Sequence, residues 1–110
     1  MRSPMDRLRR KLTVETLWLY ILAVLEKHGP TYAYNIKRLI RETFGFTPST
    51  MTLYSVVYRL EKAGLLDKIE DGSYRVTDLG RKSLEEGIQF IRGITELLEK
   101  AARGDGSSGP

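Results

Sequence analysis

The sequence lacks cysteine altogether and holds one histidine, His28, and one tryptophan, Trp18, in 110 residues. Without cysteine the chain has no disulfide, no thiolate metal site and no thiol nucleophile, which fits a reducing, cytoplasmic location. His28 follows a predicted helix, where the helix dipole explains it. No second catalytic partner, glycine-rich phosphate loop or metal-ligand spacing accompanies it. We therefore expect neither an enzyme nor a cofactor.

Long hydrophobic runs are missing as well. The densest apolar stretch, residues 17–25, covers nine residues, whereas a membrane-spanning helix needs about 20. No signal peptide is visible, so we expect no membrane partner. The length of 110 residues predicts one small domain, whose modest core would gain from an additional partner surface.

What the chain has instead is a local excess of positive charge. The net charge of +4 arises entirely within residues 1–11. The charged residues there are Arg2, Arg7, Arg9, Arg10 and Lys11, offset by Asp6. A basic segment on a neutral body favours a polyanionic partner such as DNA, and a merely solvated helix end is the alternative.

Apolar periodicity and capping residues predict a short basic helix followed by three longer ones. Ser3 and Pro4 are typical of a helix start. Whether this helix continues into the next one or bends at Thr13 stays open. The three longer helices cover residues 14–27, about 32–43 and 49–62. Thr31 suits the cap of the second of these.

Two short β-type runs follow, at residues 65–69 and 73–77, and the Asp71-Gly72 pair between them is a hairpin signal. Thr77 can then cap a last helix that ends at about Arg103. This order predicts a mainly α protein of winged helix-turn-helix fold. The predicted parts are a basic N-terminal segment (1–11), the winged helix-turn-helix domain (12–77), a C-terminal dimerisation helix (78–103) and a flexible tail (104–110).

Two helices carry more apolar surface than one small domain can cover. Residues 17–25 are apolar on every face, which indicates burial on every face. The last helix has two adjacent apolar stripes, which suggests a partner subunit, unless it folds back on its own domain. The predicted dimer interface consists of Leu17, Trp18, Tyr20, Ile21, Ile88, Phe90, Ile91, Ile94, Leu97 and Leu98.

The third of the longer helices, residues 49–62, is the predicted DNA reader. Its aliphatic residues lie on one side, and hydroxyls and tyrosines that can bond phosphates or base edges lie on the other. In helix-turn-helix proteins the N-terminal part of this helix enters the major groove. A solvated polar face is the alternative. The predicted contacts on this helix are Ser49, Thr50, Met51, Thr52, Tyr54, Ser55 and Tyr58.

Further phosphate contacts are predicted on both sides of that helix. The helix before it offers Tyr32, Tyr34, Lys37 and Arg38, and the wing offers Lys68, Ser73 and Arg75. We expect one of the two tyrosines to pack in the core instead. Glu70 and Asp71 at the wing tip would repel phosphate, so the wing is the weaker candidate.

Four motifs carry a resemblance to a known family. They are Tyr32-Ala33-Tyr34, Thr52-Leu53-Tyr54, residues 59–65 (Arg-Leu-Glu-Lys-Ala-Gly-Leu) and residues 74–81 (Tyr-Arg-Val-Thr-Asp-Leu-Gly-Arg). With these motifs, residues 19–86 resemble the PadR family of transcriptional regulators. The resemblance implies a homodimeric repressor of the short branch, built on its N-terminal and C-terminal helices. It also implies that Tyr34 and Tyr54 contact DNA, with Thr52 at the start of the reading helix.

The chain departs from the family pattern at three places, where Ala33 and Met51 replace glycines and Ser55 replaces a proline. These departures bear on the operator that is read. Relatives often bind aromatic small molecules at the dimer interface, and Trp18, Tyr20 and Phe90 could line such a space. An ordinary packed aromatic core is the alternative there.

The residues and the resemblance together predict a homodimeric, sequence-specific regulator of transcription that binds double-stranded DNA as a repressor. The alternative is a winged-helix module that binds proteins and has lost its DNA contacts. The acidic wing tip favours that alternative, whereas the basic N-terminus and the tyrosine-rich reading face favour DNA.

Overall fold

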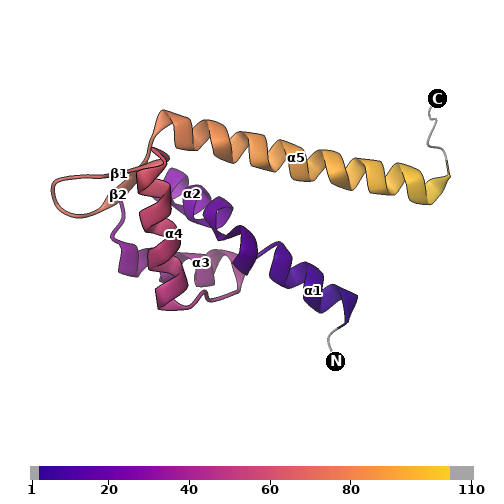
Figure 1. Cartoon of the computed structure of the whole chain (residues 1–110), viewed down its shortest axis with the longest axis horizontal. Coiled ribbons are helices and arrows are strands. Elements are labelled where there is room, and N and C mark those ends of the chain that lie inside the picture. Colours follow the sequence, from indigo (N-terminus) through magenta and orange to yellow (C-terminus); the bar gives the residue numbers. More distant parts are fainter. Residues whose placement is uncertain (1–2, 105–110) are drawn as a thin grey trace.

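The computed structural model describes residues 3–104. Arg2 and the part of the predicted tail from residue 105 onward lie outside the described residues. The chain forms α1 (Pro4–Lys11), a 3-10 turn η1 (Val14–Thr16), α2 (Leu17–His28), α3 (Ala33–Phe44), α4 (Thr50–Lys62), β1 (Leu66–Lys68), β2 (Tyr74–Val76) and α5 (Asp78–Arg103). The predicted mainly helical fold, with its two-stranded wing and its long last helix, is confirmed (Figure 1).

Helix α1 is separate from α2. Ser3 caps it as predicted: its hydroxyl accepts a hydrogen bond from the Asp6 N–H at 3.1 Å, and the Asp6 carboxylate accepts one from the Ser3 N–H at 3.3 Å. The chain then bends at Thr13 (φ −123°, ψ −81°). The Tyr20 hydroxyl donates to the Leu12 carbonyl just before the bend. The bend directs α1 away from the core.

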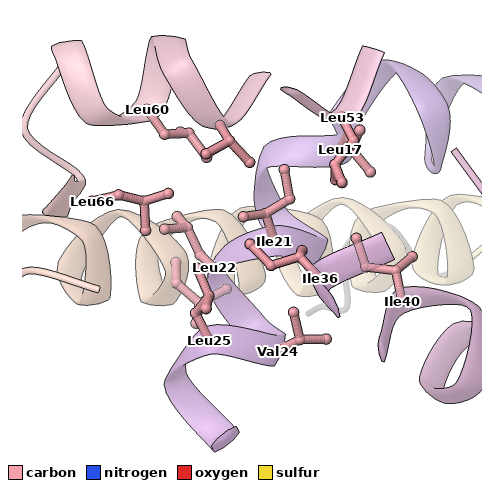
Figure 2. Packing of buried hydrophobic residues seen from close by; sticks show 12 residues of the cluster. Leu17, Ile21, Leu22, Val24, Leu25, Ile36, Ile40, Leu53, Leu60 and Leu66 are labelled. Atoms are coloured by element: carbon pink, nitrogen blue, oxygen red, sulfur yellow. The ribbon is translucent and has the colours of Figure 1, made fainter. Parts of the chain in front are cut away.

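Helix α2 is the centre of the core. It packs against α3, α4, α5 and the second strand of the wing. The buried cluster consists of Leu17, Ile21, Leu22, Val24, Leu25, Ile36, Ile40, Leu53, Val57, Leu60, Leu66 and Leu84 (Figure 2). Leu17 and Ile21, predicted at a dimer interface, are therefore covered by their own chain. An all-apolar helix is buried on several sides here because three helices and a strand surround it.

The wing is anchored to the helices by a third pairing. Strands β1 and β2 pair antiparallel, with Asp67 opposite Arg75. Thr31 forms an additional antiparallel bridge to Tyr74: each N–H donates to the other carbonyl, at 3.0 and 2.9 Å. The Thr31 hydroxyl donates to the Gly29 carbonyl, so it does not cap α3 as predicted. This bridge fixes the wing beside the first turn of α3.

Helix α5 begins in contact with the body and ends beyond it. The Thr77 hydroxyl caps it as predicted and accepts from the Gly80 N–H at 3.0 Å. Near Gly87 the helix passes close to Leu19 and Trp18 of α2. Beyond that point its large apolar side chains are exposed, and Figure 1 shows the helix extending past the body. Among residues 3–104, no helix is both long and apolar enough to cross a membrane.

Candidate DNA-binding surface

Helix α4 is positioned by a cap at its start and by an apolar side. Ser49 is the N-cap: its side-chain oxygen accepts from the Thr52 N–H at 3.1 Å and its hydroxyl donates to the Thr52 hydroxyl at 2.9 Å. Leu53, Val57 and Leu60 are buried against α2 and α3. The opposite face and the first turn of α4, with its free N–H groups, are therefore directed outward, as a groove-reading helix requires.

Four residues form the centre of that outward face. Successive helical residues are about 100° apart, so Met51, Ser55, Tyr58 and Lys62 lie opposite the buried side. Met51 is 82% exposed. The Lys62 ammonium lies 5.2 Å from the centre of the Tyr58 ring. Thr52 lies on the flank of α4 instead, where it lines a hollow of about 650 Å³ together with Trp18 and Val56.

Two predicted basic residues of α3 have partners within the domain. The Lys37 ammonium donates to the Thr50 hydroxyl at 2.8 Å, which links α3 to the first turn of α4. Arg38 pairs with Glu42 one turn further along α3, at 3.2 Å. Lys37 is thus held beside the N-terminus of α4, where helix geometry also favours an anionic group.

A tyrosine hollow joins the two helices and the wing. It has a volume of about 340 Å³ and is lined by Tyr32, Ala33, Tyr34, Tyr54, Val57, Lys68, Gly72 and Tyr74. The rings of Tyr32 and Tyr34 are parallel within 1°, with centres 5.7 Å apart. Neither ring packs in the core, contrary to the prediction for one of them, because Thr31 and the wing hold this segment at the surface.

The wing presents fewer contacts than predicted. Ser73 is only 2% exposed, since its hydroxyl and its N–H both donate to the Asp71 carboxylate, at 2.6 and 2.9 Å. These bonds lower the pKa of Asp71. Asp71 in turn raises the pKa of the neighbouring Tyr32 through its charge and a hydrogen bond. Asp71 thus braces the wing tip, and Ser73 is not available to DNA.

The two basic residues of the wing, Lys68 and Arg75, are exposed, and each of them contacts another side chain. Arg75 pairs with Asp67 across the hairpin at 3.6 Å, and the Lys68 ammonium lies 5.9 Å from the centre of the Tyr74 ring. Exposed pairs of this kind contribute little stability and can be exchanged for another anion. Lys68 and Arg75 are therefore accessible to a phosphate, and Lys68 lines the tyrosine hollow.

The three aromatic residues predicted to line an effector space, Trp18, Tyr20 and Phe90, do not all point in the same direction. Trp18 and Tyr20 are two residues apart on α2 and so point about 200° apart. Tyr20 packs edge-to-face on Phe44 and Phe46, with ring centres 4.8 and 5.0 Å away. Phe90 is largely exposed on α5. Tyr20 therefore takes part in the packing of its own chain.

Two contributors to this surface are absent from the predicted contacts. Lys62 lies on the outward face of α4 at i+4 from Tyr58, where helical spacing predicts it, although it is not among the predicted contacts. Tyr74 lines the tyrosine hollow, but only its pairing with Thr31 places it there, and no local pattern signals that pairing.

The comparisons with known proteins agree with this arrangement. Residues 21–86 match the family described as "Transcriptional regulator PadR-like family". A solved transcriptional regulator from Clostridium thermocellum is similar over 91% of this chain and 97% of its own, with 27% identity and a TM-score of 0.67. The structure of a complex of hsRosR-S1 shares the fold over 90% of this chain and 96% of its own, with 24% identity and a TM-score of 0.61. No curated protein matches the chain.

Proposed function

Because the chain belongs to the PadR-like family of transcriptional regulators, we propose that it binds specific DNA sites as a homodimer and represses transcription from them. The resemblance drawn from the tyrosine and Arg-Leu-Glu motifs is confirmed by this membership. A DNA-binding regulator is the function class of the family. The homodimer, the repression and the contact residues are our proposals.

The outward face of α4 is the observation that supports sequence reading. Its side chains combine a methionine, a serine hydroxyl and a tyrosine on a helix whose first turn carries the exposed residues Thr50 and Met51. Such groups can contact base edges and the thymine methyl group in the major groove. The tyrosine hollow and Lys37 border this face and offer donors to the flanking phosphates.

The exposed end of α5 supports the homodimer. Beyond Gly87 its large apolar side chains are Ile88, Phe90, Ile91, Ile94, Leu97 and Leu98, and all of them are exposed. Soluble monomers rarely expose so extended an apolar surface. A second copy of the same helix, related by a two-fold axis, covers such a surface with its own equivalent. We propose that these six residues and Trp18 form the dimer interface.

A two-fold dimer predicts the form of the operator. The two α4 helices would read half-sites about 34 Å, or one helical turn, apart on a pseudo-palindrome. Selection of bound duplexes from random sequence at physiological salt measures both the site and its symmetry. A pool that acquires no common sequence would refute sequence-specific binding, whereas a single unrepeated half-site would refute the symmetric dimer.

The variant Tyr54→Ala is expected to weaken operator binding about 10-fold, the loss of one good contact to an ionised phosphate or a base edge. Its fold should persist, because the side chain is 46% exposed. Fluorescence anisotropy titration measures the binding and thermal unfolding checks the fold. The control variant is Leu79→Ala. It truncates a side chain of similar exposure, 52%, on α5 rather than on α4. Equal affinities of the two variants would remove Tyr54 from the DNA-binding surface.

A winged-helix module that binds another protein is the competing function. The carboxylates of Glu70 and Asp71 at the wing tip are the observation that favours it, since they would face the DNA phosphates. The two functions differ in their response to DNA sequence: a protein-binding module would show the same weak affinity for a selected operator and for scrambled DNA at every salt concentration.

A further inference from the structure

We propose that α1 is a second DNA-contacting element, which binds backbone phosphates outside the base pairs that α4 reads. The inference rests on the proposed DNA-binding function. It adds a second DNA-contacting surface, which raises the affinity for DNA without changing the preference for one sequence. The N-terminal excess of positive charge predicts a polyanionic partner, and the proposal identifies that partner as DNA bound by α1.

The positive charge of the chain is concentrated on this helix. The whole net charge of +4 belongs to the first eleven residues, and α1 carries four of the basic side chains among residues 3–104: Arg7, Arg9, Arg10 and Lys11. None of the residues of α1 is buried. Since the remainder of the chain is electrically balanced, attraction to a polyanion acts first on α1.

The rest of the chain, in contrast, offers no net attraction to DNA, because its basic side chains are matched in number by Asp and Glu. Arg38 and Arg75, for example, each lie beside a carboxylate, that of Glu42 and that of Asp67. The wing tip adds the negative charges of Glu70 and Asp71. Duplex DNA is bound largely through neutralised phosphates, so a nearly neutral winged helix benefits from a basic element next to it.

The cations of α1 are available to a ligand. Arg7 makes no ion pair with any of residues 3–104. Arg10 and Lys11 share one carboxylate, that of Glu15, at 3.4 and 3.1 Å. Arg9 pairs with Asp6 at 3.4 Å. All of these side chains are substantially exposed, and exposed pairs are weak enough to be replaced by contacts with phosphate.

The helix has two faces that suit two neighbours. Met5, Leu8 and Leu12 form an exposed apolar stripe at helical spacing. Arg7 and Arg10 lie roughly opposite, and Lys11 lies at the edge of the stripe, beside Leu8. The three basic residues line a surface hollow of about 770 Å³ that also includes Ser3, Pro4, Leu8 and Glu15. The apolar stripe can therefore face a partner subunit while the basic face remains directed toward DNA.

The position of α1 places its charges away from the reading helix. The bend at Thr13 directs α1 out of the body, and in Figure 1 it extends well beyond α3 and α4. In that view α5 runs along the upper edge, and α1 and the loop that leads into α4 both lie below it. Eight helical residues span about 12 Å, enough to follow several phosphates outside the α4 half-site.

A basic amphipathic helix can also bind an anionic membrane surface, and the composition of α1 decides against that partner. Its apolar stripe has only three members and no aromatic residue, whereas interfacial helices bury a broad apolar face with Trp, Phe or Leu. Because this stripe is too narrow for membrane insertion, we assign the phosphates that the Arg-rich face can bind to DNA.

The first test removes the basic face in the full chain with Arg7→Gln, Arg10→Gln and Lys11→Gln together. Each lost phosphate contact lowers the slope of log K against log salt by about 0.9, which amounts to up to about 2.7 for the three contacts of one chain and about 5.4 for the proposed dimer. The triple variant should weaken binding to operator and scrambled DNA in equal proportion, so that the preference for operator is retained. The matched control, Lys82→Gln, Arg92→Gln and Lys100→Gln on α5, should keep the wild-type slope.

An unchanged slope in the α1 variant, or an equal drop in the control, would overturn the proposal. So would binding of the wild-type protein to vesicles of anionic phospholipid that the α1 variant loses while its DNA slope stays the same. Failure of the proposed function looks different: the wild-type protein would then bind operator and scrambled DNA equally, whatever α1 contributes to the slope.

The second test does not depend on the oligomeric state and uses the absence of cysteine. Arg9→Cys carrying an iron chelate should cut the DNA backbone outside the base pairs cut by the same reagent on Lys62→Cys of α4. A reagent on Lys100→Cys of α5 serves as the control and should cut far less. Absence of cleavage from position 9, with cleavage from position 62, would refute the contact.

Discussion

Replacing Ile94 and Leu97 by glutamate is expected to leave the protein folded but monomeric, and to weaken operator binding at least about 100-fold. Both side chains lie on the part of α5 beyond the body, 41% and 64% exposed, so their loss removes little packing within the chain. Two carboxylates buried in an apolar interface carry a large desolvation penalty. A monomer also loses the gain that two linked half-site contacts provide, typically 100-fold or more, about 10² to 10⁴.

Sedimentation equilibrium measures the change from a dimer to a single chain of 12.6 kDa, and circular dichroism checks that the helices remain. Gln89→Glu with Lys100→Gln is the matched control, because it alters the net charge equally on the polar side of α5. The proposed interface is wrong if the Ile94/Leu97 variant still sediments as a dimer, or if the control dissociates equally.

The elements of this fold were predictable where local chemistry decides them. Ser3, Ser49 and Thr77 are short polar residues directly before helical patterns, and each one caps its helix in the structure. The order of helices and strands then follows from apolar periodicity and from the Asp71-Gly72 turn. This is why the winged-helix fold could be inferred without any tertiary information.

The errors arise where distant segments meet. Thr31 is locally a good helix cap, but its backbone pairs with Tyr74 and its hydroxyl bonds to Gly29. Leu17 and Ile21 belong to a helix that is apolar all round, and the sequence cannot say which of its sides its own domain covers. Only the packing of α3, α4 and α5 around α2 assigns both residues to the core.

The residues of the candidate site divide in the same way, into those that local spacing places and those that only tertiary packing places. The outward direction of Met51, Ser55 and Tyr58 follows from helical spacing alone, whereas the flanking position of Thr52 depends on how α4 packs against α2. Ser73 reads as a polar strand residue and is in fact buried against Asp71. That bond spans only two residues, so the Asp-Gly-Ser sequence was a usable signal for it.

The largest loss of stability from one added methyl group is expected at Gly80. A Cβ there would lie 2.2 Å from the Leu65 carbonyl oxygen and 2.9 Å from Val76 Cγ1. The oxygen is a backbone atom that accepts a hydrogen bond from the Thr77 N–H at 3.1 Å, so it cannot move without disturbing the junction of α4, the wing and α5. We expect Gly80→Ala to cost about 3 kcal/mol, the upper part of the range for overpacked sites, and to lower Tm by more than about 10 °C.

The sign of this effect separates packing from helix propensity, because alanine normally stabilises a helix interior by about 0.5–1 kcal/mol relative to glycine. Gly93 on the same helix is the matched control: its added Cβ would meet nothing within 4 Å, so Gly93→Ala should raise Tm. Gly87→Ala should fall between the two, since its closest contact, at 2.6 Å, is the movable end of the Leu19 side chain. A thermal unfolding series in which Gly80→Ala matches or exceeds the wild type would show that α5 does not sit against the Leu65 carbonyl, and would remove the contact that fixes the long helix relative to the reading surface.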